Sequence, residues 1–334
     1  MLTFVQDEKD GYKFWKLNAA SRQYVQDSHF TIDSLNTFFA RQLEYISPRL
    51  LDVIYAELRA VKYLPVNSEA GPGASSYTWR MYDMQGAAQF IANYGTDFRV
   101  INISGNEYTT NIYPIGDSYE WTFQDLRSAM MTGFPLNMRQ ANAAARAVMQ
   151  LENTTLLYGY APLNIFGWFN QPNIPTGVVP ANGIGGSTLF VDKTPDQIIA
   201  DFGSLINSIT INTKEVEMAN TVVMSTTTKT YLKSTPRSNL SDTSILEWLQ
   251  GAYADQIPPE NWLTLVELET AGPGGSRMMI AYNKNPDKIE AIIPQPLEQL
   301  PTETNGIVWK QRLHERIGGV ICPYPLSNNF LTGM

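Results

Sequence analysis

The segment between residues 63 and 115 constrains the fold more than any other part of this chain. It opens with YLPVNSEAGPGASS, in which Gly, Pro and Ser interrupt any regular element up to residue 76. From Ser75 to Tyr82 the side chains then alternate, with Tyr77, Trp79 and Met81 on one face and the residues between them on the other. This period of two predicts a half-buried strand.

A second extended stretch, Asn106 to Ile115, follows a turn expected near Asn93 to Thr96. Residues 68–115 therefore predict a long two-stranded ribbon. Two strands alone are at best marginally stable in water. With ~15 residues per strand and ~3.3 Å per residue, the ribbon can reach ~50 Å. We therefore expect it to lie against another surface and to be long enough to touch a neighbouring molecule.

Aromatic and charged side chains of this segment are the expected contact residues. Aromatic side chains dominate cores and interfaces, which favours packing over stacking on a small ligand, the alternative use of such residues. The predicted inter-subunit contacts are Tyr77, Trp79, Arg80, Tyr82, Phe90, Tyr94, Phe98, Tyr108 and Tyr113.

Helix signals surround the ribbon. Apolar residues recur at helical spacing from Thr31 to Arg41. Thr122 and Asp125 have the spacing of a capping box, and the helix they begin is interrupted at residues 133–135 by Gly-Phe-Pro. An Ala-rich helix is predicted beyond this break, with an apolar stripe made of Met138, Ala141, Ala145, Val148, Leu151 and Thr155.

The remainder of the chain predicts a mixed lobe of helices and strands. Residues 160–192 form an irregular connection whose length suggests a domain crossing or a contact loop. Thr194, followed by Pro195 and Gln197, marks a helix start. The other expected elements are strands at Val222, Trp262–Leu268, Arg277–Tyr282, Ile289–Ile293 and Ile307–Cys322, and a helix at Ser241–Leu249. Together they indicate an α+β fold.

Composition narrows the choice of partner. The net charge is −8, and residues 63–192 carry five Lys/Arg against nine Asp/Glu, so no basic surface is expected to bind nucleic acid directly. No apolar run approaches the ~20 residues that cross a bilayer, so no membrane contact is expected. Acidic residues within the first ten positions argue against a secretory signal and favour synthesis in the cytoplasm.

Motifs for catalysis or cofactor binding are sparse. With only His29 and His314 and a single cysteine, Cys322, we expect no metal site, no cofactor and no intrachain disulfide. The thiol is expected to be a small buried side chain. A glycoside hydrolase would need two carboxylates ~5–9.5 Å apart. The acids available for such a pair are Glu107, Asp117, Glu120 and Asp125, for which a solvated surface is the favoured interpretation.

Four segments carry a family resemblance. YEWTFQDLRSAMMTGFPLNMRQANAAARAVM (119–149) resembles the spine-helix region of tailed-bacteriophage major capsid proteins. PVNSEAGPGASSYTWRMYDMQGAAQFI (65–91) is similar to the extended loop of that family, SDTSILEWLQ (241–250) to its apical lobe, and residues 294–326 to its closing strand. The four segments occur in the family's order, which makes the resemblance more specific than any single motif.

The resemblance implies the Hong Kong 97 capsid fold. It would divide the chain into an N-terminal arm (1–62), an extended loop (63–115), a peripheral domain with the spine helix (116–192 and 296–334) and an axial domain (193–295). Its implied function is a non-enzymatic shell subunit, made in the host cytoplasm and located in the virion, that forms pentamers and hexamers of an icosahedral capsid. Partners would be other copies, a portal complex and packaged double-stranded DNA nearby, with room for a cement or decoration protein.

Two departures from well-known members refine this expectation. Some members crosslink through a lysine of the extended loop, whereas this chain has no lysine between Lys62 and Lys193, so we expect a noncovalent shell. Some members also lose an N-terminal segment to a protease, and a chain that starts at Met1 predicts no such removal. Two alternatives remain: an encapsulin-like compartment with the same fold, and a carbohydrate-active enzyme that uses the acids named above.

Overall fold

The computed structural model describes residues 2–6, 13–17, 57–85, 102–132, 136–238, 240 and 242–334. The chain has two units, Met1–Ala56 and Glu57–Met334. In the first unit, β1 (Leu2–Gln6) pairs antiparallel with β2 (Lys13–Leu17). The expected helix at 31–41, the turn at 93–96 and the predicted contacts Phe90, Tyr94 and Phe98 lie outside the described residues.

The second unit contains the predicted ribbon. Strand β4 (Ser76–Gln85) pairs antiparallel with β5 (Asn102–Asn111), from Ser76 opposite Asn111 to Gln85 opposite Asn102. The second strand was expected at 106–115, but it begins at Asn102 and ends at Asn111. The reason is Ile112, which is buried and donates its N–H to the carbonyl of Ser75, so that the chain leaves the ribbon there.

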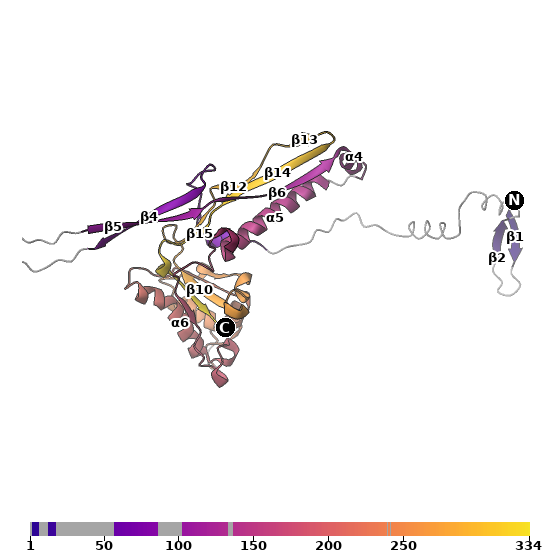
Figure 1. The fold of residues 1–334 in the computed structure, drawn as a ribbon. Helices are drawn as coiled ribbons and strands as arrows, with labels where there is room; N and C mark the ends of the chain where they lie inside the picture. The colour runs from indigo at the N-terminus through magenta and orange to yellow at the C-terminus, as the bar shows by residue number, and fades with distance from the viewer. Residues whose placement is uncertain are drawn as a thin grey trace, which may run out of the picture. The chain divides into compact units, whose positions relative to one another are not determined.

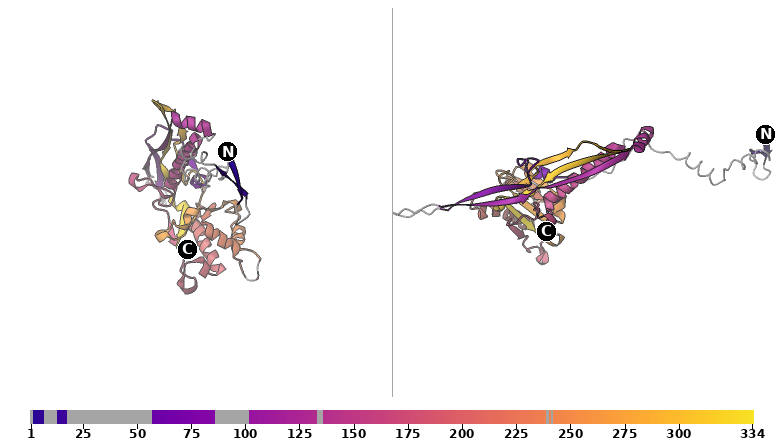
Figure 2. Two further views of the ribbon diagram at one scale, coloured as in Figure 1. Left: turned by 90° about the vertical axis from the view of Figure 1, so that its right-hand side faces the viewer. Right: turned by 45° about the horizontal axis from the view of Figure 1, so that its top comes forward.

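Beyond Ile112 the chain enters a different sheet. Strand β6 (Tyr113–Thr122) pairs along its whole length with β14 (Val308–Ile317), which also pairs with β12 (Gln295–Gln299) and β13 (Glu303–Asn305). Figures 1 and 2 show β6 running on in the direction of β5. The expected strand 307–322 is thus two strands, β14 and β15 (Gly319–Ile321). Gly319, the first residue of β15, has φ 78°, and a Cβ there would lie 2.5 Å from the carbonyl oxygen of Phe166.

Helices α4 (Phe123–Thr132) and α5 (Leu136–Tyr158) follow β6. The predicted capping box is confirmed, since the N–H of Thr122 donates to Asp125 Oδ2 at 2.9 Å and the N–H of Asp125 donates to Thr122 Oγ1 at 3.2 Å. Figure 1 shows α5 lying along the sheet of β6 and β14.

The buried face of α5 differs from the predicted stripe. Val148 and Thr155 are buried as predicted, but Met138 and Leu151 are exposed. The buried face also includes Ala144 and Leu156, which lie outside the predicted stripe. Alanine-rich sequence fits several helix faces about equally, because a small side chain can be either buried or exposed. The face is selected by the sheet against which the helix packs.

A five-stranded sheet forms the centre of the other lobe, in the order β7-β16-β10-β8-β9. Its strands are β7 (Thr176–Val178), β8 (Thr221–Met224), β9 (Trp262–Thr264), β10 (Met278–Tyr282) and β16 (Asn328–Thr332). Strand β10 is antiparallel to β8 and β16, while β7–β16 and β8–β9 are parallel pairs. Since β7 and β16 lie outside residues 193–295, the expected boundaries of the axial segment are not boundaries of this sheet.

Both faces of this sheet are buried. Successive residues of β10 alternate between two cores, with Ile280 and Tyr282 in one and Met279 and Ala281 in the other. The second core is completed by α6 (Pro195–Asn212), α7 (Thr226–Ser234) and α8 (Ile245–Ala252). Burial of each large apolar side chain contributes about 1.5–3 kcal/mol.

The first core joins this sheet to the rest of the unit. It includes Leu156 and Leu157 of α5, together with residues of α3 (Ala60–Tyr63) and of the small sheet β15-β11-β3. That sheet consists of β15, β11 (Glu290–Ile292) and β3 (Val66–Asn67). The C-terminal end of α5 is therefore anchored in the same core as the five-stranded sheet.

Candidate assembly surface

The ribbon has two faces of different character. Residues directly opposite each other in an antiparallel pair project to the same face. Tyr77, Trp79 and Met81 lie on an inner face and are half-buried, whereas Thr78, Arg80 and Tyr82 lie on an outer face and are exposed. This is the alternation that the sequence predicts for β4.

The inner face packs on its own chain at the base of the ribbon. Trp79 stacks on Tyr108 with ring centroids 5.7 Å apart, and on Tyr77 at 6.4 Å. Tyr77 and Trp79 also pack against the cluster of Ile112, Ile292 and Ile321. Burial raises the pKa of the Tyr77 phenol, and Asn67 Nδ2 donates to its oxygen at 3.2 Å. Tyr77 and Trp79 thus first anchor the ribbon to its own subunit.

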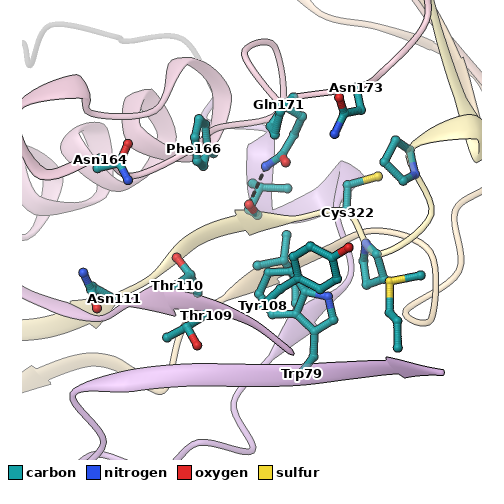
Figure 3. A pocket seen from close by; sticks show the side chains of 16 residues that line it. Trp79, Tyr108, Thr109, Thr110, Asn111, Asn164, Phe166, Gln171, Asn173 and Cys322 are labelled. Atoms are coloured by element: carbon teal, nitrogen blue, oxygen red, sulfur yellow. Dashed lines mark hydrogen bonds between the residues drawn. The ribbon is translucent and has the colours of Figure 1, made fainter. Parts of the chain in front are cut away.

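A cavity of about 430 Å³ lies between this inner face and the body (Figure 3). Its lining is uncharged and mixes aromatic residues such as Trp79 and Tyr108 with amide side chains such as that of Gln171. Cys322 also lines the cavity and is buried, as the sequence analysis expected. Burial raises the pKa of its thiol to about 12, so the sulfur remains protonated. The residues that line the cavity include no Asp, Glu, Lys, Arg or His.

The outer face is the uncovered surface of the ribbon. The hydroxyls of Thr78 and Thr109 lie 2.9 Å apart, and Arg80 Nε donates to Glu107 Oε1 at 2.7 Å. This hydrogen bond raises the pKa of the Arg80 guanidinium. The charges therefore neutralise each other within the ribbon.

Two apolar side chains of the outer face remain exposed. Tyr82 is 68% exposed and Ile103 is 65% exposed. The Tyr82 ring lies against Gly105, where a Cβ would be 3.0 Å from the ring, so the glycine lets the ring lie flat on the strand. The ribbon thus presents apolar surface outward. Ile103 lies within the predicted ribbon but was missed as a contact, because the sequence analysis chose only aromatic residues and Arg80.

Tyr113 does not belong to the ribbon. It begins β6, where it lies opposite Ile317 of β14 and is half-buried. It was assigned to the ribbon because the apolar pattern continues through Ile112, and the change of partner strand at that residue is not encoded in the alternation.

The four acids considered for hydrolysis lie on separate elements or faces. Glu107 lies on β5, where it pairs with Arg80 of β4, and Asp125 caps α4. Asp117 and Glu120 are three residues apart on β6, so their side chains leave opposite faces of the sheet. Within the described ranges there is no group of three or more His, Cys, Asp or Glu that could hold a metal ion. In that same part of the chain, no helix is long and apolar enough to cross a membrane.

Several solved structures have an architecture similar to that of this chain. The capsid of Myoviridae phage XM1 superposes with a TM-score of 0.75 at 19% identity, covering 88% of this chain and 98% of that one. The capsid of an empty GTA particle gives 0.59 at 11% identity (95% and 99% covered), and Mycobacterium phage Bobi gives 0.57 at 11% identity (90% and 98% covered). These likenesses show the Hong Kong 97-type capsid fold.

The sequence comparison is independent of the superpositions. No curated protein matches the chain. A family model described as Major capsid protein matches residues 86–334, well over half of the sequence. The match begins within the ribbon segment and covers α5, the five-stranded sheet, the sheet of β6 and β14, and the C-terminal strands. This chain therefore belongs to the major capsid protein family.

Proposed function

We propose that this chain is the shell subunit of a tailed bacteriophage, which forms pentamers and hexamers that join into an icosahedral capsid around double-stranded DNA. The observation that carries this proposal is the outer face of the β4–β5 ribbon. Its strands pair with no third strand among the described residues, and it presents Tyr82 and Ile103 to solvent. A two-stranded ribbon gains stability when such apolar surface is covered by a neighbour.

The contacts between subunits are noncovalent in this proposal. No lysine occurs between Lys62 and Lys193, so the ribbon has no amine with which to form a side-chain amide bond. Ring-closing contacts of one surface with a different surface on the next copy generate pentamers and hexamers. Association then depends on burial of aromatic and aliphatic side chains, with Tyr82 and Ile103 as the principal contacts of the described part of the ribbon.

The test replaces the two exposed apolar side chains together. We expect Tyr82→Ser/Ile103→Ser to leave the chain folded, because neither side chain is part of a core, and to abolish shells in electron micrographs of the expressed protein. Thr78→Ser/Thr109→Ser on the same face keeps the hydroxyl pair and is the matched control. Intact shells from the first variant, at wild-type yield, would contradict the proposed role of the outer face.

The content of the particles separates a capsid from a cellular compartment of similar fold. Purified particles are expected to contain portal and tail proteins by mass spectrometry and nuclease-resistant DNA. A single enzyme as the enclosed cargo, without DNA, would refute the capsid proposal and support the compartment.

A further inference from the structure

Two carboxyl groups meet in the joint between α5 and the β6–β14 sheet. Glu315 is on β14, where Gln311, Leu313, Glu315 and Ile317 form the buried face. Glu315 is only 1% exposed. Glu152 of α5 is partly buried and lies within hydrogen-bonding distance of the Glu315 side chain. The joint therefore brings two acids together at its centre.

This contact requires a proton. Glu315 Oε2 is buried and has no hydrogen-bond donor among the described groups if both acids are ionised, because a carboxylate only accepts. A proton on one acid supplies the missing donor and removes one of the two like charges. Burial and then the charge of Glu152 raise the pKa of Glu315 to about 8, and burial also raises the pKa of Glu152.

No cation compensates the pair within the described structure. On β6, the residue opposite Glu315 is Ile115, and the nearest acid, Asp117, is exposed. On β14, His314 and Arg316 project to the opposite face of the sheet, and their register partners on the adjacent strand β12 are Glu298 and Gln295.

The remaining elements packed against the pair do not change this picture. On α5, Arg146 is the basic residue nearest in sequence to Glu152, and it does not contribute to the pKa shift of either acid. Helix α3 also contacts α5; its Lys62 is paired with Glu57, and neither Lys62 nor Tyr63 contributes to the pKa shift of either acid. Strand β15, which contacts α5 as well, contains no titratable side chain. The protonation of the pair is thus governed by burial and by the two acids themselves.

We propose that one proton shared between Glu152 and Glu315 fastens α5 to the β6–β14 sheet, and that its loss at alkaline pH loosens this joint. The C-terminal end of α5 stays anchored, because Leu156 and Leu157 are fully buried in the first core. Towards the N-terminus, the buried apolar residues of the helix are Ala144 and Val148. Repulsion at Glu152 therefore separates the portion before it and leaves the end as a pivot.

The sign of the pH dependence follows from the direction of the shifts. The folded chain holds a proton that the unfolded chain, with Glu near its ordinary pKa of about 4.3, has already released. The stabilisation is complete below that pKa and is lost as the pH rises through the pKa of the folded pair, near 8. In this window the unfolding equilibrium constant rises by up to about tenfold per pH unit.

The test is urea unfolding of the full chain as unassembled subunit between pH 5 and 9, so its outcome does not depend on shell formation. Wild type is expected to lose stability across this range and then to level off. Glu315→Gln is expected to lack this slope, because its amide N–H donates to the Glu152 carboxylate and no carboxyl proton is needed for the contact. Glu120→Gln, an exposed acid on the neighbouring strand, is the control and should follow wild type. Equal slopes for wild type and Glu315→Gln would overturn the proposal.

Local opening is measured separately by amide hydrogen exchange, corrected for the intrinsic effect of pH. Protection of residues 140–152 should fall between pH 6 and pH 9 in wild type and stay unchanged in Glu315→Gln. If that variant does not fold, Glu152→Gln replaces it, with the same expectation. Unchanged protection of wild-type α5 at pH 9 would refute the proposal that α5 loosens from the sheet when the shared proton is lost.

Discussion

At the scale of single residues, the buried ion pair of Lys193 and Asp201 is where a substitution is expected to cost the most stability. Lys193 Nζ lies 2.6 Å from Asp201 Oδ2, and the two side chains are 0% and 2% exposed. The pair links the residue before the Thr194 cap to the interior of α6. Each charge has lost its water, so each depends on the other.

Removal of one partner is therefore expected to cost far more than removal of an exposed pair. Lys193→Ala should lower the free energy of unfolding by about 3–5 kcal/mol, because Asp201 is left buried without its counter-charge. Glu303→Ala, which breaks the exposed pair with Arg312, should cost less than about 1 kcal/mol. Urea unfolding of both variants measures the difference, and similar losses would show that the buried pair is already hydrated.

At the scale of elements, the β6–β14 pair depends on a glycine in the middle of a strand. A Cβ at Gly116 would lie 2.5 Å from the carbonyl oxygen of Leu313, a contact that only backbone movement can relieve. The close approach of the two backbones explains a glycine where strand propensity disfavours one.

Two Gly→Ala variants should accordingly change the stability of the chain in opposite directions. Gly116→Ala is expected to destabilise the chain by about 1–3 kcal/mol, because it forces β6 away from β14. Gly251→Ala in α8 has open space around the new methyl group and should stabilise by up to about 1 kcal/mol, since alanine favours a helix. Thermal or urea unfolding reports both, and a neutral Gly116→Ala would show that the sheet can shift at no cost.

Elements with local causes could be predicted from the sequence, and those with distant causes could not. The caps at Thr122 and Thr194 were predicted because the two residues of a capping box lie within four consecutive positions of the sequence. Strand β7 was missed, because three residues in a Pro- and Gly-rich stretch become a strand only by pairing with β16, far along the chain.

The same reasoning applies to the candidate surface. Alternation in β4 predicted which residues share a face, but not which face its own subunit covers. The pairing of Glu152 with Glu315 left no trace in the sequence, because the two acids meet only when α5 packs on β14.

At the scale of the whole molecule, the described base of the ribbon supports its own subunit while its outer face remains open. Deletion of the whole segment 68–112 would therefore also remove core contacts of Tyr77, Trp79 and Ile112. A sharper variant replaces residues 82–105 by Asn-Gly, which joins Met81 to its register partner Asn106 through a two-residue hairpin turn.

This shortened chain is expected to remain a folded, soluble subunit that forms no shells. Circular dichroism and size-exclusion chromatography check the fold, and electron microscopy checks assembly. Wild-type shells from the shortened chain would mean that contacts elsewhere suffice, whereas an unfolded product would assign the removed part a role in folding.

The position of β16 determines when the protein can fold. This strand occupies residues 328–332, yet it lies between β7 and β10, and all five of its residues are buried. Until residues 328–332 have been synthesised, the sheet is split at that place and its two cores stay open. The ribbon at 76–111 is synthesised long before this gap closes. The body therefore cannot be completed before residues 328–332 have been synthesised, and a nascent chain that still lacks β16 cannot supply a finished subunit to a growing shell.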